Sequence, residues 1–475
     1  MSTVPGSCTA SSTVPANSPA QGPGSASAHT GADGKKHLKV LTGMDSAAVR
    51  AMHDKYLMPA TFHYYADALV LQRGDGMFVT DADGQTYLDF FGGILTVSLG
   101  HCHPEVTAAV SEQLRTLGHT STLYQNEWIA RLAKEVADRT PGSLQQSFFT
   151  NSGTEADEMA VMLAKLHTGR SEIIALRHSY SGRGMYAVSA MGHANWRPIA
   201  PVMPGISLMP APYCYRCPFG LTYPSCEVRC ADDIKEVLAT TTTGRPAAFI
   251  AEPILGVGGF ITPPKEYFQR VLEPVRKAGA LFICDEVQTG WGRTGTYWSG
   301  IEHYGVQPDI MTFAKGVASG APMGITTTTP EIAASFKGLT LSTYGGNPIS
   351  TVSALATLHV MTREDIPGRA ARLGAKLRTG LLALMDKHPL IGDVRGMGLM
   401  QGIELVEDRK TKEPAAKRTN LLVESLRKRR LLIGKGGLYG NTLRIAPPML
   451  VEESQIGDAL GLLDEALTEV RTAAV

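Results

Sequence analysis

The sequence predicts an α/β fold in which a large domain built on a mostly parallel sheet is joined to a smaller α+β domain. Two short apolar runs, residues 281–284 and 310–314, have the pattern of strands that are buried on both faces of a parallel sheet. The first run is followed by Asp285 and the second by Lys315. Because the carboxyl ends of such strands meet at the ligand-binding edge of the sheet, we expect both side chains to face one crevice.

An aspartate and a lysine at one sheet edge suit pyridoxal 5'-phosphate (PLP). Lys315 can form a Schiff base with the aldehyde of PLP, and Asp285 can bind the pyridinium nitrogen and keep it protonated, which strengthens the ring as an electron sink. Each residue alone is more often structural, because a strand-end Asp is usually a cap or a surface group and a lysine is usually solvated. The prediction therefore depends on the other motifs of the chain.

Length and composition exclude several classes of protein. The 475 residues favour two domains, or one large α/β domain with an appendage, and 43% hydrophobic with 19% charged residues is typical of a globular enzyme. The net charge of +1 argues against nucleic acid or an acidic membrane as the main partner, and no apolar run is long enough to span a bilayer. Seven cysteines in so long a chain do not indicate a disulfide framework, which favours a reducing compartment.

Residues 1–35 are rich in Ser, Thr, Ala, Pro and Gly and show no hydrophobic periodicity, so we expect a disordered tail. The tail lacks the basic and apolar regions of a secretory signal. It also contains no arginine, which weakens a mitochondrial transit signal. We expect a cytoplasmic protein, with a mitochondrial location as the alternative if the chain is eukaryotic.

Residues 36–90 are expected to form the first part of the small domain. The pattern predicts a helix at 46–57 and an antiparallel meander of strands at 69–71, 77–80 and 86–90, with turns at 74–76 and 81–84. Pro104 is suited to open a helix that ends near residue 117. The adjacent His, Cys and His at 101–103 have no second cluster to complete a metal site, so we expect a structural turn there.

Residues 148–156 predict a strand, a tight turn and the start of a helix. Backbone N–H groups at such a helix start, together with the helix dipole, can hold a phosphate dianion. Ser152 and Thr154 can add hydroxyl donors, and Gly153 allows close approach of the backbone. An ordinary helix cap explains the same residues equally well, because Ser and Thr are preferred at that position.

Taken together, these motifs resemble the class III (ω-) aminotransferases of PLP fold type I. The matching segments are 151–156 (NSGTEA), 285–295 (DEVQTGWGRTG), 308–316 and 343–348 (TYGGNP). The resemblance extends over nearly the whole chain from about residue 50, with the motifs in the order and spacing of the family. Residues 62–104 are most similar to the alanine–glyoxylate aminotransferase 2 branch.

The resemblance implies a seven-stranded, mostly parallel sheet in the large domain, with PLP as the cofactor. It implies that Lys315 is the Schiff-base lysine and proton shuttle and that Asp285 pairs with the ring nitrogen. The implied cofactor contacts are Ser152, Gly153 and Thr154 at the phosphate, Tyr180 on the ring face, Gln288 near the ring hydroxyl, and Thr343 at the phosphate of the neighbouring subunit. A homodimer or a dimer of dimers is therefore expected. Ser181 stands where family members commonly have His, and its role is open.

The two remaining domain boundaries follow from the pattern after the lysine motif. We expect residues 91–350 to form the large PLP-binding domain and residues 351–475 to form the second part of the small domain. The second part shows helical patterns from about 350 to 384 and at 416–429, strand patterns at 391–405 and near 431 and 443, and a final helix. The basic run 427–430 is expected to be a solvated helix end, where cations suit the dipole.

Four cysteines between residues 214 and 230 form a C-x2-C and a C-x3-C pair, which could hold a structural zinc. The short spacer and the interrupting prolines and aromatics favour a packed loop of free cysteines instead. We therefore predict no metal site, and keep zinc at Cys214, Cys217, Cys226 and Cys230 as the alternative.

The resemblance also bears on the substrate. Ornithine and 4-aminobutyrate members carry a Glu where this chain has Val257, and that Glu pairs with an arginine that matches Arg444. Without it, Arg444 is expected to stay available for the carboxylate of an amino or keto acid, because a guanidinium binds a carboxylate in bidentate fashion. A structural ion pair is the alternative role of Arg444.

The predicted function is PLP-dependent transamination by ping-pong half-reactions. The donor is alanine or an ω- or β-amino acid, and the acceptor is a 2-oxo acid such as glyoxylate or pyruvate. The alternatives are a 4-aminobutyrate or ω-amine transaminase that uses 2-oxoglutarate or pyruvate, and a PLP-dependent phospho-lyase, because one cofactor supports several fates of one carbanion. A non-catalytic binding module is the alternative from another class.

Overall fold

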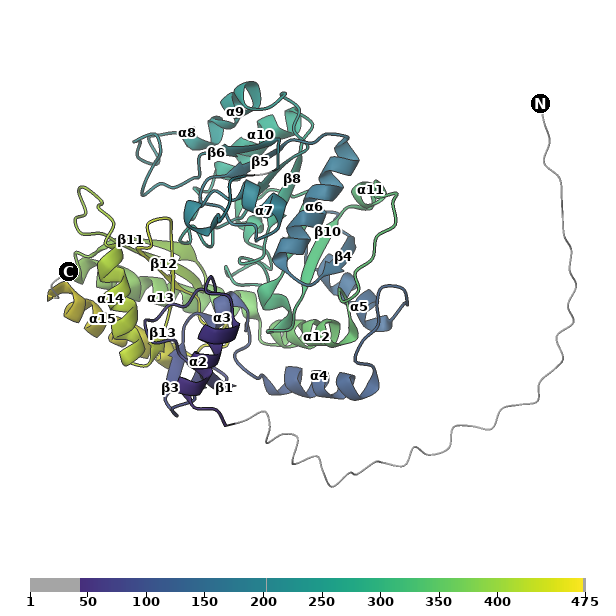
Figure 1. Cartoon of the computed structure of the whole chain (residues 1–475). Coiled ribbons are helices and arrows are strands. Elements are labelled where there is room, and N and C mark those ends of the chain that lie inside the picture. The colour runs from purple at the N-terminus through teal and green to yellow at the C-terminus, as the bar shows by residue number, and fades with distance from the viewer. Residues whose placement is uncertain (1–42, 202, 473–475) are drawn as a thin grey trace, which may run out of the picture.

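A computed structural model describes residues 43–201 and 203–472 of the chain. The predicted tail, residues 1–35, lies outside these described residues. The described part consists of a larger unit around a seven-stranded sheet and a smaller unit that carries two four-stranded sheets (Figure 1).

The seven-stranded sheet forms the centre of the larger unit. Its strands are β4 (Gln146–Thr150), β5 (Ile173–Leu176), β6 (Ile206–Met209), β7 (Ala248–Ala251), β8 (Leu281–Asp285), β9 (Ile310–Phe313) and β10 (Gly324–Thr328). The spatial order is β4-β10-β9-β8-β7-β5-β6, and only β10 runs antiparallel to its neighbours. The predicted α/β architecture with a mostly parallel seven-stranded sheet is confirmed.

Helices cover both faces of this sheet, which explains why its strands are apolar at consecutive positions. In β8, Ile283 packs in one cluster with α6 (Gly153–Thr168) and α7 (Met185–Ala190). Phe282 and Cys284 point to the opposite face, in the cluster that contains α10 (Tyr267–Lys277). Side chains alternate along a strand, so one run of five residues contributes to two cores.

Short helices fill the connections of the larger unit. They are α8 (Arg229–Asp232), α9 (Ile234–Thr240) and α11 (Pro330–Ala333), with 3-10 turns η1 (Ala194–Trp196), η2 (Gly300–Tyr304) and η3 (Lys315–Ala318). Below the sheet in Figure 1, α12 (Pro348–Arg363) packs on α4 (Pro104–Thr116) and α5 (Glu127–Ala137). Next along the chain, α13 (Ile366–Lys387) packs on the smaller unit.

The smaller unit is built from both ends of the described chain. One sheet, in the order β11-β12-β15-β14, is antiparallel and contains β11 (Ile391–Met397), β12 (Met400–Leu405), β14 (Gly434–Gly436) and β15 (Thr442–Ile445). The other contains β1 (Leu71–Asp75), β2 (Phe78–Asp81), β3 (Thr86–Asp89) and β13 (Leu431–Leu432), which pairs in parallel with β3. This pairing brings residues from both ends of the described chain into one α+β unit. The domain boundaries given above stay predictions.

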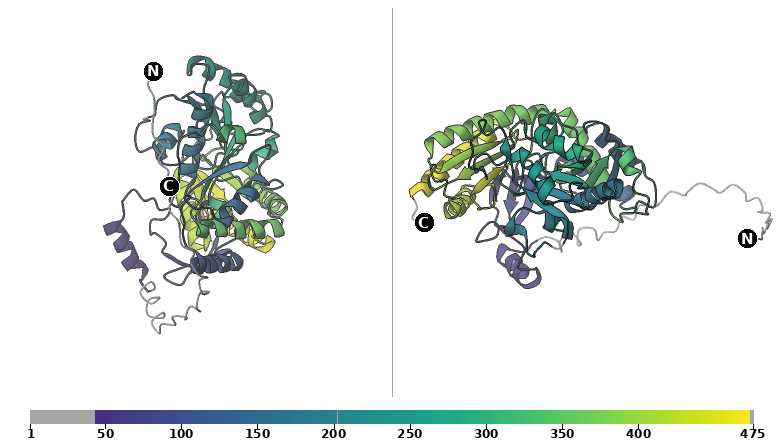
Figure 2. Two further views of the ribbon diagram at one scale, coloured as in Figure 1. Left: turned by 90° about the vertical axis from the view of Figure 1, so that its right-hand side faces the viewer. Right: turned by 90° about the horizontal axis from the view of Figure 1, so that it is seen from above.

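Four helices complete the smaller unit and its surroundings. They are α2 (Ser46–Tyr56), α3 (Gly92–Leu95), α14 (Ala416–Lys428) and α15 (Glu453–Thr472). Figure 2 shows α2 projecting away from the body of the molecule. The predicted helices at 46–57, 104–117 and 416–429 each agree with the structure to within one residue.

The start of the meander differs from the prediction. A strand was expected at 69–71 and a turn at 74–76, but β1 runs through Gly74 to Asp75. Asp75 lies opposite Phe78, so Gly76 and Met77 alone make the hairpin loop. Gly76 adopts a φ of +51° and pairs with the backbone of His101. The turn therefore begins at residue 76, whereas the glycine pattern predicted that it begins at residue 74.

The shared core around β8 gives a prediction about stability. Phe282 is fully buried and stacks on Phe249 with ring centroids 5.9 Å apart. We expect Phe282→Ala to lower the free energy of unfolding by about 3–5 kcal/mol, because it removes a large side chain and leaves a cavity. The matched control, Phe78→Ala at an exposed position of β2, should change the free energy of unfolding by less than about 1 kcal/mol. Equal shifts of the denaturation midpoint in both variants would contradict this account of the core.

Candidate active site

Asp285 and Lys315 lie at one edge of the large sheet. Asp285 ends β8, and Lys315 follows β9 by two residues. The two strands are parallel neighbours in which Asp285 pairs with Thr312, so their carboxyl ends coincide. Both side chains line one cavity. Lys315 has a φ of +47°, a conformation that a side-chain-bearing residue adopts only when its surroundings impose it.

Burial acts on both charges of this pair. It raises the pKa of Asp285, and the Val287 N–H, which donates to Asp285 Oδ1 at 3.0 Å, and nearby Lys315 oppose that rise. Burial lowers the pKa of Lys315, and the carboxyls of Asp285 and Glu252 oppose that fall. A cationic ring nitrogen beside Asp285 would stabilise the negative charge of the carboxylate, which burial disfavours.

Two further carboxyl groups line the same cavity, and sequence reasoning gave neither of them a role. Glu252 directly follows β7 and accepts hydrogen bonds from the backbone N–H groups of Tyr180, at 3.0 Å, and Gly256, at 2.7 Å. Burial, helped by Asp285, raises the pKa of Glu252 to about 8. The signal for Glu252 was in the sequence, because it ends a buried strand just as Asp285 does.

The other carboxyl is that of Asp157, on α6. It is 1% exposed, and Thr312 donates its hydroxyl hydrogen to Asp157 Oδ1 at 2.7 Å. Burial raises the pKa of Asp157 well above its usual value, and the neighbouring charge of Asp285 adds to the rise. Asp157 lies four residues after Gly153 and therefore on the same helix face, which was the available signal.

The start of α6 forms a cradle for an anion. Ser152 caps the helix by accepting the Glu155 N–H at 3.2 Å, so its hydroxyl hydrogen is left to donate elsewhere. Gly153 and Thr154 line the cavity. At Gly182, across the cavity wall, a Cβ would lie 2.0 Å from Thr154 Oγ1, so only glycine fits there. The capping role and the phosphate role of these residues are thus compatible, because they use different atoms.

The remaining wall suits an aromatic ring with a hydroxyl group. Tyr180 and Ser181 line the cavity, and the Tyr180 ring makes an edge contact with Trp196 at 6.1 Å between centroids. Gln288 is buried, and its Oε1 has no hydrogen-bond partner among the described residues. A ring hydroxyl would satisfy this acceptor. With an anion cradle, a carboxylate and a lysine around one cavity, the residues fit PLP.

Arg444 reaches the site from β15 of the smaller unit. Its guanidinium donates to the backbone oxygen of Lys435 at 3.1 and 3.2 Å and to the Tyr64 hydroxyl at 3.2 Å. It also lies over the rings of Phe91, at 4.9 Å, and Phe260, at 5.8 Å. Every hydrogen bond that Arg444 makes to the described residues ends on a neutral oxygen, so its charge is not used in an ion pair there.

Thr343 does not join the site within one chain. It is exposed, in the connection between α11 and α12, and is not among the residues that line the cavity. Leu339, Leu341 and Tyr344 in the same connection are also exposed.

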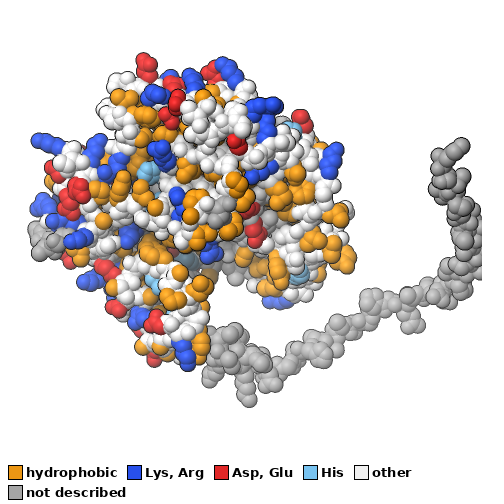
Figure 3. Space-filling model, turned by 45° about the horizontal axis from the view of Figure 1, so that its top comes forward, with side chains coloured by type: hydrophobic (Ala, Val, Ile, Leu, Met, Phe, Trp, Pro, Cys, Tyr) orange, Lys and Arg blue, Asp and Glu red, His pale blue; other side chains and the backbone are white. Residues whose placement is uncertain are grey.

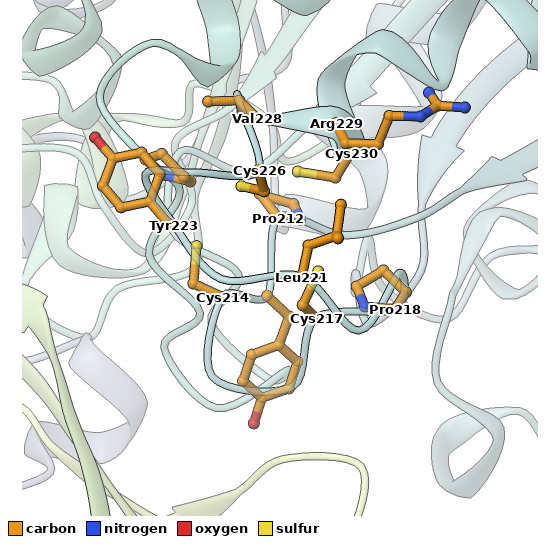
Figure 4. Close-up of a pocket in the computed structure, with 12 residues that line it drawn as sticks. Pro212, Cys214, Cys217, Pro218, Leu221, Tyr223, Cys226, Val228, Arg229 and Cys230 are labelled. Atoms are coloured by element: carbon orange, nitrogen blue, oxygen red, sulfur yellow. The ribbon is translucent and has the colours of Figure 1, made fainter.

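The four cysteines after Tyr213 line a separate small cavity, with their side chains around it (Figure 4). All four are free thiols. Burial raises the pKa of Cys214 to about 11 and that of Cys230 to about 12, which favours the neutral thiols. In residues 43–201 and 203–472, no three His, Cys, Asp or Glu side chains are grouped so that they could hold a metal ion. The packed loop and the alternative zinc site at these four cysteines both stay predictions.

The charged side chains on one face of the molecule are mixed in sign. Figure 3 shows basic and acidic side chains interspersed on the face in view. Within the described ranges, every helix is too short or too polar to cross a membrane.

Comparison with known proteins identifies the family. The family model for aminotransferase class-III matches residues 62–467. The alanine–glyoxylate aminotransferase 2 homolog 2, mitochondrial, of Arabidopsis thaliana is 40% identical over 430 residues, which are 90% of this chain and 89% of that protein.

Two solved structures agree with this assignment. An (S)-enantioselective ω-transaminase from Thermomicrobium roseum is 34% identical with a TM-score of 0.83, covering 90% of this chain and 100% of that one. An amine transaminase from an uncultivated Pseudomonas species, in its PLP-bound form, is 31% identical with a TM-score of 0.81, covering 87% and 98%. The matched region contains every cavity residue described above, and the chain belongs to the class III aminotransferases, which are PLP-dependent enzymes.

Proposed function

We propose that this aminotransferase moves an amino group between alanine, or an ω- or β-amino acid, and a 2-oxo acid such as glyoxylate or pyruvate. The observation that carries the proposal is the guanidinium of Arg444, which is buried near Lys315 without a carboxylate partner in the described chain. A buried charge of this kind is costly unless a ligand pairs with it. The carboxylate of an amino or keto acid is such a ligand, and the name of the Arabidopsis relative supports alanine and glyoxylate.

The cavity residues have distinct proposed roles. When bound, PLP supplies an electron sink for the charge left when a substrate proton is removed. Lys315 takes that proton and returns it, and its lowered pKa, caused first by burial, leaves more of the neutral amine that this task requires. Asp285 holds the ring nitrogen and Gln288 the ring hydroxyl. Tyr180 covers the ring, and the start of α6 binds the phosphate through Ser152, Gly153 and Thr154.

Val257 supports the proposed freedom of Arg444. Its backbone oxygen accepts the Gly437 N–H at 3.0 Å, which fixes the segment beside β14. Its side chain is aliphatic and cannot neutralise a guanidinium. Arg444 therefore has no competitor at Val257 for the substrate carboxylate, and bidentate pairing there would orient the amino or keto group toward Lys315.

The first experiment follows the visible absorbance of the purified, PLP-loaded protein. We expect the band of the bound cofactor to bleach when L-alanine is added and to return when glyoxylate follows. Lys315→Ala should remove the exchange, and borohydride reduction of the wild type should fix the cofactor on Lys315. Lys387→Ala, an exposed lysine that pairs with Asp464, is the matched control and should behave as wild type.

Each other outcome has a definite meaning. A band that ignores alanine but bleaches with an ω-amine would move the donor to the ω-amine class. Release of phosphate from a phosphorylated amine without nitrogen transfer would favour the phospho-lyase. No band after addition of PLP would contradict the proposed function altogether.

Arg444 gives a second prediction. Arg444→Ala should raise the KM for the 2-oxo acid about 10- to 100-fold, because a hydrogen bond to a charged group contributes about 1.5–3 kcal/mol. Arg444→Lys should recover only part of this loss, since an ammonium cannot bind both carboxylate oxygens in the same way. Steady-state kinetics measure both, with exposed Arg115→Ala as the control. An unchanged KM in Arg444→Ala would leave the guanidinium a purely structural role.

We also propose that the active unit is a homodimer or a dimer of dimers, in which Thr343 of one chain completes the phosphate site of the other. The exposed apolar side chains of Leu339, Leu341 and Tyr344 beside Thr343 support a second copy as the occupant of this surface, because such patches usually mark interfaces.

Sedimentation velocity tests the assembly. The wild type should sediment at twice the chain mass or more, and Leu341→Glu should shift it toward the monomer and weaken PLP binding at the same time, since a buried unpaired carboxylate is costly. Leu421→Glu, at an exposed position of α14, is the control and should leave the sedimenting mass unchanged. A wild-type monomer that retains PLP would refute the shared site.

The cytoplasm stays the proposed compartment, because seven cysteines in so long a chain do not indicate a disulfide framework and favour a reducing compartment. The mitochondrion is the alternative, which the name of the Arabidopsis relative supports. Fractionation of the source cells distinguishes the two compartments.

A further inference from the structure

Asp157 is a buried acid for which the proposed reaction gives no role. Its carboxyl lines the cofactor cavity from α6, as that of Asp285 does, and it accepts the hydroxyl of Thr312, the residue that pairs with Asp285 on the neighbouring strand, so that the two carboxyls act on each other. Two such carboxylates cannot both be ionised in a buried site, so one proton must lie between them. The question is which of the two acids holds it.

The surroundings of the two carboxyls are unequal. Asp285 accepts the Val287 N–H at 3.0 Å and lies near the ammonium of Lys315, and both favour a negative charge. Asp157 accepts only a neutral hydroxyl, that of Thr312 at 2.7 Å. Glu252, Tyr186 and Cys284 also face Asp157 and add no positive charge. The charge of Lys315 acts on Asp157 more weakly than on Asp285, which is the first of the carboxyls that raise the pKa of Lys315. The negative charge is therefore better stabilised on Asp285 and the proton on Asp157.

We propose that Asp157 is a positioning residue that keeps its proton at neutral pH and donates it in a hydrogen bond to Asp285. This inference rests on the proposed role of Asp285 as the partner of the cofactor nitrogen. The hydrogen bond holds Asp285 in its charged form and limits its rotation, so that one oxygen stays directed at the ring nitrogen. Thr312, which pairs with Asp285 across the sheet, fixes Asp157 in turn.

The raised pKa of Asp157 supports this assignment. Its first cause is burial and its second is the charge of Asp285. A raised pKa shifts the carboxyl toward its protonated form, whereas an exposed Asp would have lost its proton at neutral pH. Asp157 thus supplies a hydrogen-bond donor where an ordinary aspartate would only accept.

Two substitutions separate donation from packing. Asp157→Asn keeps the size of the side chain and replaces the O–H donor by an N–H donor, so the dissociation constant of PLP should stay within about threefold of wild type. Asp157→Leu keeps the bulk and removes the donor, and should weaken PLP binding about 10- to 100-fold. Spectroscopic titration of the full-length protein with PLP measures both, and melting temperatures confirm that each variant is folded. Equal effects of Asn and Leu, or no effect of Leu, would overturn the proposal.

Infrared difference spectroscopy reports on the proton itself. At neutral pH the wild type minus Asp157→Asn spectrum should show the C=O band of a protonated carboxylic acid, and the band should persist in Asp285→Asn, because burial alone keeps Asp157 neutral. Loss of the band in Asp285→Asn, or its absence from the wild-type difference, would show that Asp157 is ionised. This readout needs no bound cofactor, so a chain that failed to bind PLP would refute the proposed function while the proton on Asp157 was still decided.

Discussion

The buried carboxylate at the end of β8 is the constraint on which the rest of the site depends. Moving an ionised carboxylate out of water costs several kcal/mol unless charges or donors replace the lost water. Around Asp285 the chain supplies one backbone N–H, one lysine and one neutral acid. These partners compensate the cost only in part, since burial still raises the pKa of Asp285. The cavity is therefore electrostatically incomplete until a cation enters beside Asp285, which is the position where a protonated PLP ring would lie.

Buried charges also hold the smaller unit against the larger one. Arg444 belongs to β15, so its approach to the cavity depends on how the antiparallel sheet sits. Glu404 on β12 pairs with Arg395 of β11 and with Arg216 and Tyr213 of the larger unit. Loss of one member would leave a buried charge without its partner, which is strongly destabilising. This network ties β12, the neighbour of β15 and Arg444, to the segment that follows β6 of the large sheet.

The sequence was sufficient for the parts of the fold and site that follow from strand ends. Apolar runs closed by Asp285 and Lys315 predicted both the parallel sheet and the shared cavity, because strand direction alone fixes where such residues meet. Asp157 was missed because its place in the cavity depends on how α6 packs on the sheet, whereas Glu252 follows a buried strand and could have been found by the same reasoning as Asp285. The shift of β1 came from a backbone pairing between Gly76 and His101, which local turn patterns do not encode. Thr343 lies outside the cavity of one chain, and its proposed role at the phosphate of a second chain stays a prediction.

The guanidinium of Arg444 is buried without a carboxylate partner among the described residues, and the free-energy cost of this burial can favour one class of substrate over another. Its position over the rings of Phe91 and Phe260 keeps water from much of its surface, and its neutral hydrogen-bond partners do not cancel its charge. In the proposed function, a substrate carboxylate would regain at Arg444 what the protein lost by burying the arginine, whereas an amine without a carboxylate would leave that charge unpaired. Discrimination thus arises from a penalty against the wrong substrate as much as from attraction to the right one. The fold tolerates the free-energy cost of this buried charge because the surrounding aromatic and backbone contacts hold Arg444 in place without neutralising it.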